Sequence, residues 1–434
     1  MEDMTITKKG ISYTVEFPVH NLVFAVGDID AEGHRLMAEI GVTFRGTPLH
    51  RSSFNLGINS GRKSLCVALD EAFLEITQGE PADYHISFRH VVERMSNALK
   101  DELRGGVEAI RIKDVPISEG SKFRIDNLVV EHDANVLWGP GGTGKSLFCA
   151  WLAALTDTSA VDTQFGLLIE PGNVLYLDWE THAGEIASRL RLIHNGLGIT
   201  APSNILYQKM DNPLEYKTEV IASLVAEENI DLIVIDSMYG AVEGEMIEQN
   251  PVSRFFRALK AIGKTSLTIS HANKEGKLYG NRFIENEARS VWEISQSGAD
   301  GTPGEDGYTV DLSLFHRKVN NVPLQHPQSW QVEFNRDAVA YKRIDTFDTG
   351  DRNLLPYPDI IFGLLKRNGA MSTSDLYTRV ARIKGLHEDK VRTDVDDAIE
   401  SAIKRGTASK DDDKISISHA NPLEEKQEDG NWKI

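Results

Sequence analysis

Residues 134–154 read ANVLWGPGGTGKSLFCAWLAA, and this stretch decides the fold. It fits the pattern G-x-x-x-x-G-K-[ST], with an apolar strand before the loop and an apolar helix after it. Glycines let the backbone fold its N–H groups around an anion, and the start of the helix adds a positive dipole end. The stretch therefore predicts a phosphate-binding loop made of Gly139, Pro140, Gly141, Gly142, Thr143, Gly144, Lys145 and Ser146. Lys145 would contact the β- and γ-phosphates of ATP, and the Ser146 hydroxyl would ligate Mg²⁺.

Two further apolar runs end in acidic residues. Residues 230–237 read IDLIVIDS, and residues 173–180 read NVLYLDWE. Ligands bind at the C-terminal ends of buried parallel strands, so Asp236 is expected to hold the Mg²⁺ water shell beside Ser146. Glu180 is expected to act as the general base that polarises the attacking water, with Asp178 as the alternative base.

A fourth strand candidate, residues 266–270, is followed by His271. A polar side chain at this point could sense the γ-phosphate, although a structural histidine is the alternative. The next loop, residues 272–283, carries basic groups and an aromatic residue between glycines, a composition that suits a loop following a single nucleic-acid strand. An ordinary exposed loop is the alternative for these four residues: Lys274, Lys277, Tyr279 and Arg282.

Bulk properties exclude some classes of protein. The chain has 434 residues, of which 41% are hydrophobic and 26% charged, which is ordinary for globular domains, and it is long enough for several of them. Its formal net charge of −18 disfavours a protein that coats duplex DNA, yet a few local lysines can still hold a single strand. We expect no membrane span and no secretory signal. With two cysteines outside any metal or disulfide spacing, we expect a cytoplasmic location.

The first part of the chain, residues 1–112, is predicted to be an α+β domain rich in strands. Its role is expected to be structural or in oligomerisation, since it contains no catalytic constellation. The expected strands are residues 11–17, 21–26 and 36–44, and the expected helices are residues 62–76 and 88–103.

The rest of the chain divides into two predicted domains. Residues 113–348 alternate apolar strands with amphipathic helices, which indicates a mainly parallel sheet covered on both faces, with residues 298–307 as a hairpin loop. A linker at residues 348–353 leads to a predicted winged helix at 354–434 with a polar tail. DNA binding and protein docking are both open for this unit, because acidic and basic residues are mixed in it. Its expected elements are helices at 356–367, 373–382 and 387–405 and a hairpin at 407–418.

The order of these motifs resembles the RecA-type ATPase core over about residues 125–335. Within that class the chain is most similar to hexameric RepA-like replicative helicases and related phage and plasmid ATPases of the AAA family. The resemblance implies a RecA-like fold, a homo-oligomer with a hexamer favoured, and ATP bound between subunits. It also implies that Glu180 is the catalytic glutamate and that His271 couples the nucleotide to loops that face single-stranded DNA in a central channel.

The same resemblance implies a basic finger that enters the ATP site of the next subunit. The corresponding segment is residues 314–321, LFHRKVNN. A related K-x-R pattern would place an arginine where this chain has Asn320, so Lys318 or Arg317 would have to substitute, and Arg289 is a further candidate. Such a cation would stabilise charge in the transition state. A solvated surface charge is the alternative for each residue.

Three functions are compatible with this sequence. The first is a ring-forming ATPase that moves on DNA, of the replicative-helicase kind. The second is a recombination or helicase-loading ATPase with the same fold. The third is a nucleotide-driven switch in signalling or phage defence, whose end domains dock a protein partner.

Overall fold

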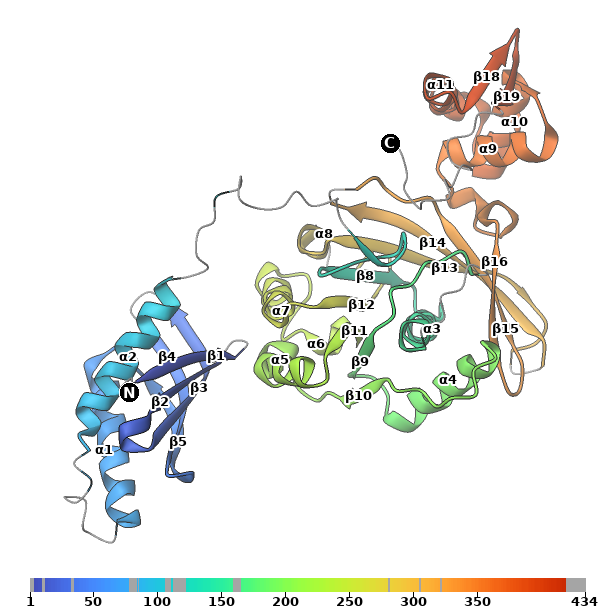
Figure 1. The fold of residues 1–434 in the computed structure, drawn as a ribbon. Helices are drawn as coiled ribbons and strands as arrows, with labels where there is room; N and C mark the ends of the chain where they lie inside the picture. Colours follow the sequence, from blue (N-terminus) through green and yellow to red (C-terminus); the bar gives the residue numbers. More distant parts are fainter. Residues whose placement is uncertain are drawn as a thin grey trace.

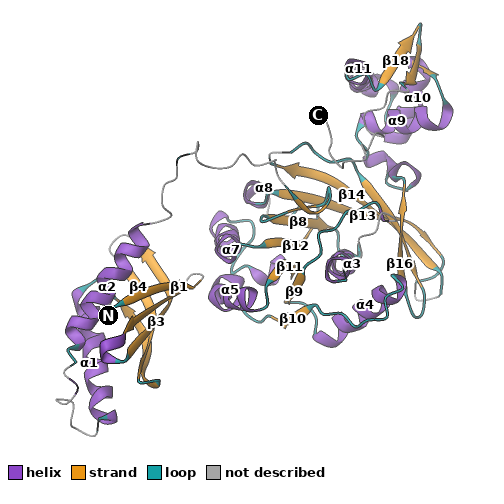
Figure 2. Cartoon of the chain, viewed as in Figure 1, coloured by secondary structure: helices purple, strands orange, loops and turns teal. Residues whose placement is uncertain are grey.

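The computed structural model describes residues 4–9, 12–32, 35–77, 84, 86–105, 111, 122–158, 165–279, 282–303, 306–320 and 322–418. Along the chain, a five-stranded sheet is followed by a nine-stranded sheet and then by a small helical unit (Figure 1). Figure 2 shows the helices of the middle unit on both sides of its sheet. No described helix combines the length and the apolar character that a bilayer span requires.

The N-terminal unit is an antiparallel meander with two helices packed on it. The strands follow one another in chain order, and their alternate residues, such as Tyr13, Val15 and Phe17, are buried. The two helices add Leu65 and Val92 to the same core. The predicted strands and helices are present here, although β1 and β5 were not anticipated. The elements are β1 (Thr5–Lys9), β2 (Ser12–Phe17), β3 (Leu22–Glu32), β4 (Arg35–Phe44), β5 (Thr47–Asn55), α1 (Asn59–Ile76) and α2 (Phe88–Gly105).

The central sheet has the order β10-β9-β11-β12-β8-β13-β14-β15-β16. From β10 to β13 neighbouring strands are parallel, because a helix returns the chain between most of them. These strands are β8 (Ala134–Gly139), β9 (Asn173–Asp178), β10 (Leu206–Lys209), β11 (Ile230–Asp236), β12 (Thr265–His271) and β13 (Ser290–Asp300).

Helices cover both faces of this sheet. One face packs against α3 (Lys145–Asp157) and α4 (Ala183–Gly196), and the other packs against α5 (Thr218–Glu227) and α7 (Gln249–Ile262). Alternate residues of one strand supply the two cores: Tyr176 belongs to the first and Leu175 to the second. Burial on both faces explains why these strands read as continuous apolar runs. The remaining short elements of the unit are β6 (Phe123–Ile125), β7 (Val129–Val130), α6 (Met238–Ala241) and α8 (Arg282–Glu287).

The sheet departs from the expected strand–helix alternation after β13. Here β14 (Tyr308–Val319), β15 (Gln328–Phe334) and β16 (Val339–Ile344) continue it as antiparallel strands. Short connections allow this antiparallel pairing, whereas a parallel strand would need a crossover helix. The mainly parallel sheet is therefore extended by an antiparallel meander. The expected hairpin loop at 298–307 falls between β13 and β14, although β13 extends to Asp300 and residues 304 and 305 lie outside the described residues.

The residues expected as a linker are packed against the sheet. Asp351 is 7% exposed, and its carboxylate accepts hydrogen bonds from the hydroxyls of Ser295 and Ser297 on β13, each at 2.9 Å. Phe315 of β14 and Phe347 also belong to the hydrophobic core of the C-terminal unit. These contacts attach the last unit to the antiparallel half of the sheet.

The C-terminal unit consists of three helices and a three-stranded sheet of order β17-β19-β18. The predicted helices and hairpin are present within two residues of their expected ends. Whether this unit acts as a winged helix stays a prediction. Its elements are α9 (Tyr357–Asn368), β17 (Met371–Ser372), α10 (Thr373–Lys384), α11 (Glu388–Lys404), β18 (Ala408–Asp411) and β19 (Lys414–Ile417). The polar tail lies outside the described residues.

Candidate nucleotide site

The strand order brings the predicted site residues to one edge of the central sheet. His271, the last residue of β12, pairs with Gly139, the last residue of β8. On the other side of β12, Asp236 at the end of β11 pairs with Asp178 at the end of β9. The backbone N–H of Trp179 also donates to the Asp236 carbonyl at 2.7 Å. The phosphate loop, both acidic strand ends and His271 are therefore neighbours at this edge.

The phosphate loop has the backbone that its glycines predict. Gly142 and Gly144 adopt φ values of 79° and 76°, which side chains other than glycine rarely allow. Gly139 is needed for a different reason, because a Cβ there would lie 2.4 Å from the carbonyl oxygen of Ile294 on β13. Apart from the chain neighbours, no heavy atom of the described residues lies within 4 Å of a Cβ placed at Gly141 or Gly142, so the loop faces open space. The loop thus leaves room for a phosphate group in front of the α3 N-terminus.

Lys145 and Thr143 brace the loop from within. The Lys145 ammonium, 5% exposed, donates to the carbonyl oxygens of Gly139 at 2.9 Å and Pro140 at 2.6 Å. Burial lowers the pKa of this lysine, while Cys149, Glu180 and Asp236 oppose the shift. The Thr143 hydroxyl also donates to the Pro140 carbonyl, at 2.9 Å. The lysine is a cation held at the mouth of the loop by neutral acceptors.

Asp236 is a buried carboxylate with a free oxygen. It is 1% exposed, and its Oδ2 accepts a hydrogen bond from the Tyr176 hydroxyl at 2.8 Å. Burial raises the pKa of Asp236, against the lowering influence of Ser146 and Tyr176. Among the described residues the Oδ1 atom has no hydrogen bond of good geometry, although the Ser146 hydroxyl lies near the carboxylate. A buried oxygen without a full hydrogen bond costs about 1–3 kcal/mol in a folded protein. Such a cost is expected where an oxygen is reserved for a cation or its water shell.

Asp178 is occupied by structural hydrogen bonds. It is fully buried, and its two oxygens accept bonds from the backbone N–H groups of Glu180 and Thr181 and from the hydroxyls of Thr181 and Tyr207. Burial alone would raise the pKa of this carboxyl, but these bonds lower it. Asp178 therefore fixes the turn that presents Glu180 and has no oxygen free for a water molecule.

Glu180 is held at the sheet edge by two polar neighbours. Its Oε1 accepts a hydrogen bond from the Ser237 hydroxyl at 2.5 Å and lies 3.3 Å from the His271 Nε2. Its side chain is 43% exposed, unlike that of Asp178. The bond with His271 is the largest cause that lowers the pKa of Glu180 to about 2, and the bond from Ser237 adds to it. Glu180 is thus an ionised, accessible carboxylate next to the phosphate loop.

A short hairpin follows His271 directly. The N–H of Tyr279 donates to the His271 carbonyl at 2.9 Å, and the N–H of Asn273 donates to the Lys277 carbonyl at 2.6 Å. At its base, the N–H of Ala272 donates to the Gly139 carbonyl at 3.0 Å. Leu278 is buried, so the hairpin is anchored to the core beside the phosphate loop.

The four candidate DNA-contacting residues do not lie equivalently. Lys274 and Lys277 are exposed at the hairpin tip, where Lys277 lies 3.6 Å from Glu275. Tyr279 is half-buried and packs against the hydrophobic core, so its first role is to stabilise the fold. Arg282 is exposed at the start of α8. Gly280 and Asn281 of this loop lie outside the described residues.

The finger candidates lie at the opposite edge of the sheet from the phosphate loop. Lys318 pairs with Val291, which pairs with Val136 near the start of β8. The Lys318 ammonium donates to the Ala288 carbonyl, and burial lowers its pKa. Lys318 therefore lies away from the phosphate loop of its own chain.

The two arginine candidates at this edge are already paired. Arg317 donates to Glu293 at 2.6 Å, and Arg289 donates to Asp133 at 2.9 Å. The N–H of Asn320 donates to the Arg289 carbonyl at 3.1 Å, so Asn320 joins the two strands. Asn321, the last residue of the predicted segment, lies outside the described residues.

The residues present fit ATP with Mg²⁺. Mg²⁺ is usually bound by one or two protein oxygens together with substrate phosphates. The free Oδ1 of Asp236 and the Ser146 hydroxyl supply such oxygens. Among the described residues no cluster of three or more His, Cys, Asp or Glu forms a separate metal cage. The open glycine loop supplies the place for the phosphates.

Sequence reasoning missed three residues of the site. Ser237 follows Asp236 in the sequence, but nothing in the pattern indicated that it would bind Glu180. Tyr176 and Tyr207 bond the two strand-end aspartates. The spacing of two places Tyr176 on the same face of its strand as Asp178, which indicates that its side chain lies on that side of the sheet. No local spacing indicates its partner, Asp236, which lies on the neighbouring strand.

Comparison with known proteins agrees with this geometry. Residues 107–277 match the family of the AAA domain. No curated protein matches the chain significantly. The matched span contains the phosphate loop, both acid-ended strands and His271. This part of the chain is therefore a nucleotide-hydrolysing P-loop ATPase domain.

Proposed function

We propose that the protein is an ATP-driven motor that acts on single-stranded DNA as a ring, in the manner of RepA-like hexameric helicases. One observation carries the proposal. The carboxylate best suited to polarise water, Glu180, is hydrogen bonded to His271, and His271 begins the hairpin that exposes Lys274 and Lys277. A DNA strand bound by this hairpin would therefore influence Glu180 through His271.

The proposed reaction uses the residues of the nucleotide site in distinct roles. Lys145 would leave its carbonyl partners for the β- and γ-phosphates, and Ser146 and Asp236 would hold Mg²⁺, which neutralises phosphate charge when bound. Glu180 would orient the attacking water and accept its proton. Asp178 would keep the turn in place. A cation from a neighbouring subunit, Lys318 or Arg317, would stabilise the charge of the transition state.

Coupling would run through the bonds of Glu180. In the present geometry Glu180 Oε1 is shared between Ser237 and His271. A displacement of the hairpin would move His271 and change the position and basicity of the carboxylate. Hydrolysis would in turn release His271 and move the hairpin, because coupling between two sites is reciprocal.

The test measures the ATPase rate with and without single-stranded DNA, together with the mass of the assembled particle. We expect single-stranded DNA to increase the ATPase rate at least about tenfold and the particle to have a hexameric mass. The double substitution Lys274→Ala and Lys277→Ala should abolish the stimulation and keep the basal rate. Lys264→Ala, a partly exposed lysine elsewhere on the same unit, is the matched control. A rate indifferent to DNA in the unmodified protein would contradict the proposal, and failure to separate a forked duplex despite stimulation would favour a loading or recombination ATPase.

A specific observation favours a second candidate, a nucleotide-driven switch without motor activity. The helix α11 exposes Asp389, Asp394 and Asp397 together with Lys390 and Arg392, a surface that does not favour DNA. Such a helix suits docking of a protein partner. A flat ATPase rate with DNA and stimulation by a protein ligand of the C-terminal unit would establish this alternative.

A further inference from the structure

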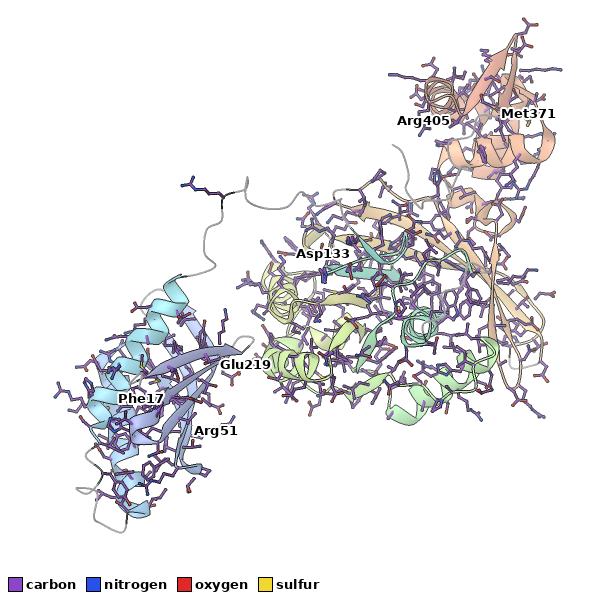
Figure 3. The ribbon with its side chains drawn as sticks, in the orientation of Figure 1. Phe17, Arg51, Asp133, Glu219, Met371 and Arg405 are labelled. Carbon is purple, nitrogen blue, oxygen red and sulfur yellow. The ribbon has the colours of Figure 1, made fainter. Side chains whose placement is uncertain are left out.

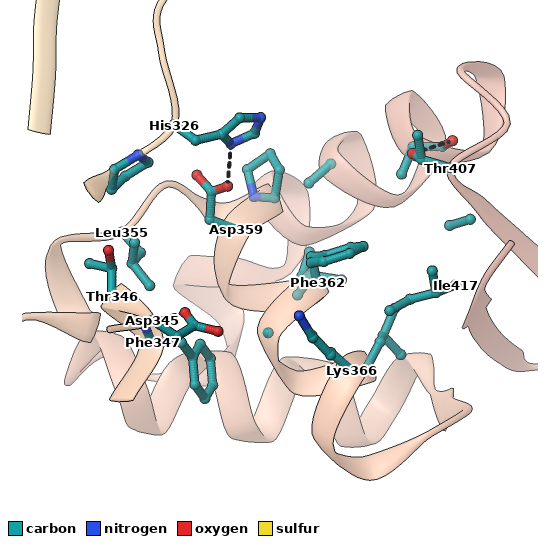
Figure 4. A pocket seen from close by; sticks show the side chains of 18 of the residues that line it. His326, Asp345, Thr346, Phe347, Leu355, Asp359, Phe362, Lys366, Thr407 and Ile417 are labelled. Atoms are coloured by element: carbon teal, nitrogen blue, oxygen red, sulfur yellow. Dashed lines mark hydrogen bonds and ion pairs between the residues drawn. The ribbon is translucent and has the colours of Figure 1, made fainter. Parts of the chain in front are cut away.

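A cavity of about 590 Å³ lies where the antiparallel half of the sheet meets the C-terminal helices (Figure 4). Its walls come from the residues just before β15, the end of β16, α9, α11 and the two strands β18 and β19. None of its lining residues belongs to the nucleotide site. Its size lies within the range of about 300–1,000 Å³ that small-molecule sites occupy.

The inner walls of the cavity are apolar. Ile361, Leu365 and Ile399 are each 5% exposed or less, and Ile415 is fully buried. Figure 4 shows Phe362 and Ile417 beside the space. Such walls favour an apolar ligand body, at about 25 cal/mol for each Å² of apolar surface removed from water.

The carboxylates at the rim of the cavity have basic partners, whereas two of its cations form no close ion pair. Two carboxylates line the cavity, and both contact basic side chains: Asp359 lies 2.8 Å from His326, and Asp345 accepts from Arg367 at 3.0 Å. Two cations line it as well, Lys366 and Arg405, and neither forms a close ion pair within the described part of the chain, although Lys366 lies near enough to Asp345 to help lower the pKa of that carboxyl. A third cation, Arg343, stacks on Trp330 at 4.4 Å and donates to a neutral amide.

This imbalance occurs in a protein with a formal net charge of −18. Lys366 lies on α9 and Arg405 follows α11, so the two cations approach the cavity from different helices. Arg405 has a single bond, from its Nε to the Ser401 carbonyl at 3.2 Å. Its guanidinium therefore keeps donors that a carboxylate or sulfonate could accept.

We propose that this cavity binds a small amphipathic anion, a carboxylate or sulfonate with an apolar chain or ring, whose head contacts Lys366 and Arg405. The apolar body lies against Ile399 and its neighbours. The site is independent of the nucleotide chemistry proposed above. Its walls belong both to the sheet and to the C-terminal unit, so an occupied site stabilises their association.

The probe is anilinonaphthalene sulfonate, an aromatic anion whose fluorescence rises in apolar sites, added to the folded full-length chain. We expect saturable binding at one site and displacement by decanoate, but no displacement by decyltrimethylammonium, which has the same chain and the opposite charge. Decanoate should also raise the Tm. Equal displacement by the cation, or binding without saturation, would overturn the proposal.

Substitutions locate the site. Lys366→Glu and Arg405→Glu should each weaken decanoate binding at least about tenfold, and Ile399→Trp should fill the cavity and remove binding. Ala402→Phe serves the same purpose if Ile399→Trp does not fold. Lys410→Glu, an exposed lysine on β18 outside the cavity, is the matched control. If all of these variants bound decanoate as the unmodified chain does, the site would lie elsewhere and the inference would be wrong.

Discussion

The two edges of the central sheet are built from the same strands and differ in how their polar groups are satisfied. At the C-terminal edge, the buried Oδ1 of Asp236 has no hydrogen bond of good geometry among the described residues, and the loop at Gly141 and Gly142 faces open space. At the other edge, Arg289 and Arg317 are each bonded to a carboxylate. The first edge therefore has a buried oxygen without a hydrogen bond, whereas the cations of the second edge are already paired with carboxylates.

This difference indicates how each edge would bind a ligand. A buried oxygen without a hydrogen bond lowers stability until a ligand binds it, so we expect the first edge to bind the nucleotide and Mg²⁺ of its own chain. A partly exposed ion pair contributes only about 0–1 kcal/mol, so the cations of the second edge can exchange partners cheaply. A neighbouring subunit's phosphates could therefore recruit them. Four sets of substitutions test this comparison.

The largest effect is expected for Lys145→Ala at the first edge. Removing this ammonium leaves the carbonyl oxygens of Gly139 and Pro140 without its bonds and the phosphates without a cation. Turnover should fall by about 1,000-fold or more, and ATP affinity should be lost. Titration with a fluorescent ATP analogue measures the affinity, with Lys264→Ala as the control. Turnover retained in Lys145→Ala would disprove the role of the loop.

The second test sets two neighbouring acids of the first edge against each other. Glu180→Gln should bind ATP normally and lose about 100- to 1,000-fold in rate, with an unchanged Tm. Asp178→Asn should lower the Tm instead, because an amide cannot accept the four bonds that the buried carboxylate accepts, at a cost of about 1–3 kcal/mol. Rate assays and thermal unfolding of both variants separate the roles. A normal rate in Glu180→Gln would transfer the base to another group.

The third test moves to the second edge. Arg317→Ala, Lys318→Ala and Arg289→Ala each remove one finger candidate, and one of them should lower turnover about 100-fold without changing ATP affinity. Mixing that variant with Lys145→Ala subunits should restore part of the rate, because intact loops then meet intact cations across the interface. Absence of rescue in mixed assemblies would place the needed cation within the same chain.

The sequence predicted the first edge much better than the second. Gly139 to Ser146 and the acid-ended strands carry local signals, because the ligand chemistry dictates residue types at fixed spacings. The strand order then places Asp236 and Glu180 beside the loop without further information. Which carboxylate is accessible depends instead on tertiary bonds, such as those from Tyr207 to Asp178 and from Ser237 to Glu180. No local pattern encodes these bonds.

The antiparallel half of the sheet was the least predictable part. The sequence predicts a hairpin loop at 298–307 between β13 and β14, but it predicts neither the continuation of the sheet through β15 and β16 nor the packing of the residues near Asp351, where it indicates a linker. Their pairing depends on contacts between distant residues, such as the hydroxyl of Ser295 with Asp351, that leave no periodic trace. The cavity between this half and the C-terminal unit arises from the same long-range packing.

The smallest effect concerns the pH dependence of the first edge. The bond with His271 is the largest cause of the low pKa of Glu180, about 2, so the carboxylate stays ionised well below neutral pH. A group with a depressed pKa loses its function only as the pH falls through that value. His271→Ala should therefore raise the pKa towards the ordinary glutamate value and move the acid limb of the rate profile up by about one to two pH units.

Steady-state rates of folded protein between about pH 3 and 8 measure this limb in His271→Ala, since ordinary glutamates titrate near 4.3. The limb of the unmodified protein lies at or below the lower end of this range. Ser237→Ala removes the second, weaker bond to Glu180 and should move the limb in the same direction by less. A stable His271→Ala variant with an unmoved acid limb, and with DNA stimulation intact, would show that the hairpin and Glu180 are not coupled through this histidine. ATP hydrolysis at the first edge would then be independent of DNA bound to the hairpin. The ion pairs of the second edge would then be ordinary surface ion pairs without a role at the nucleotide site.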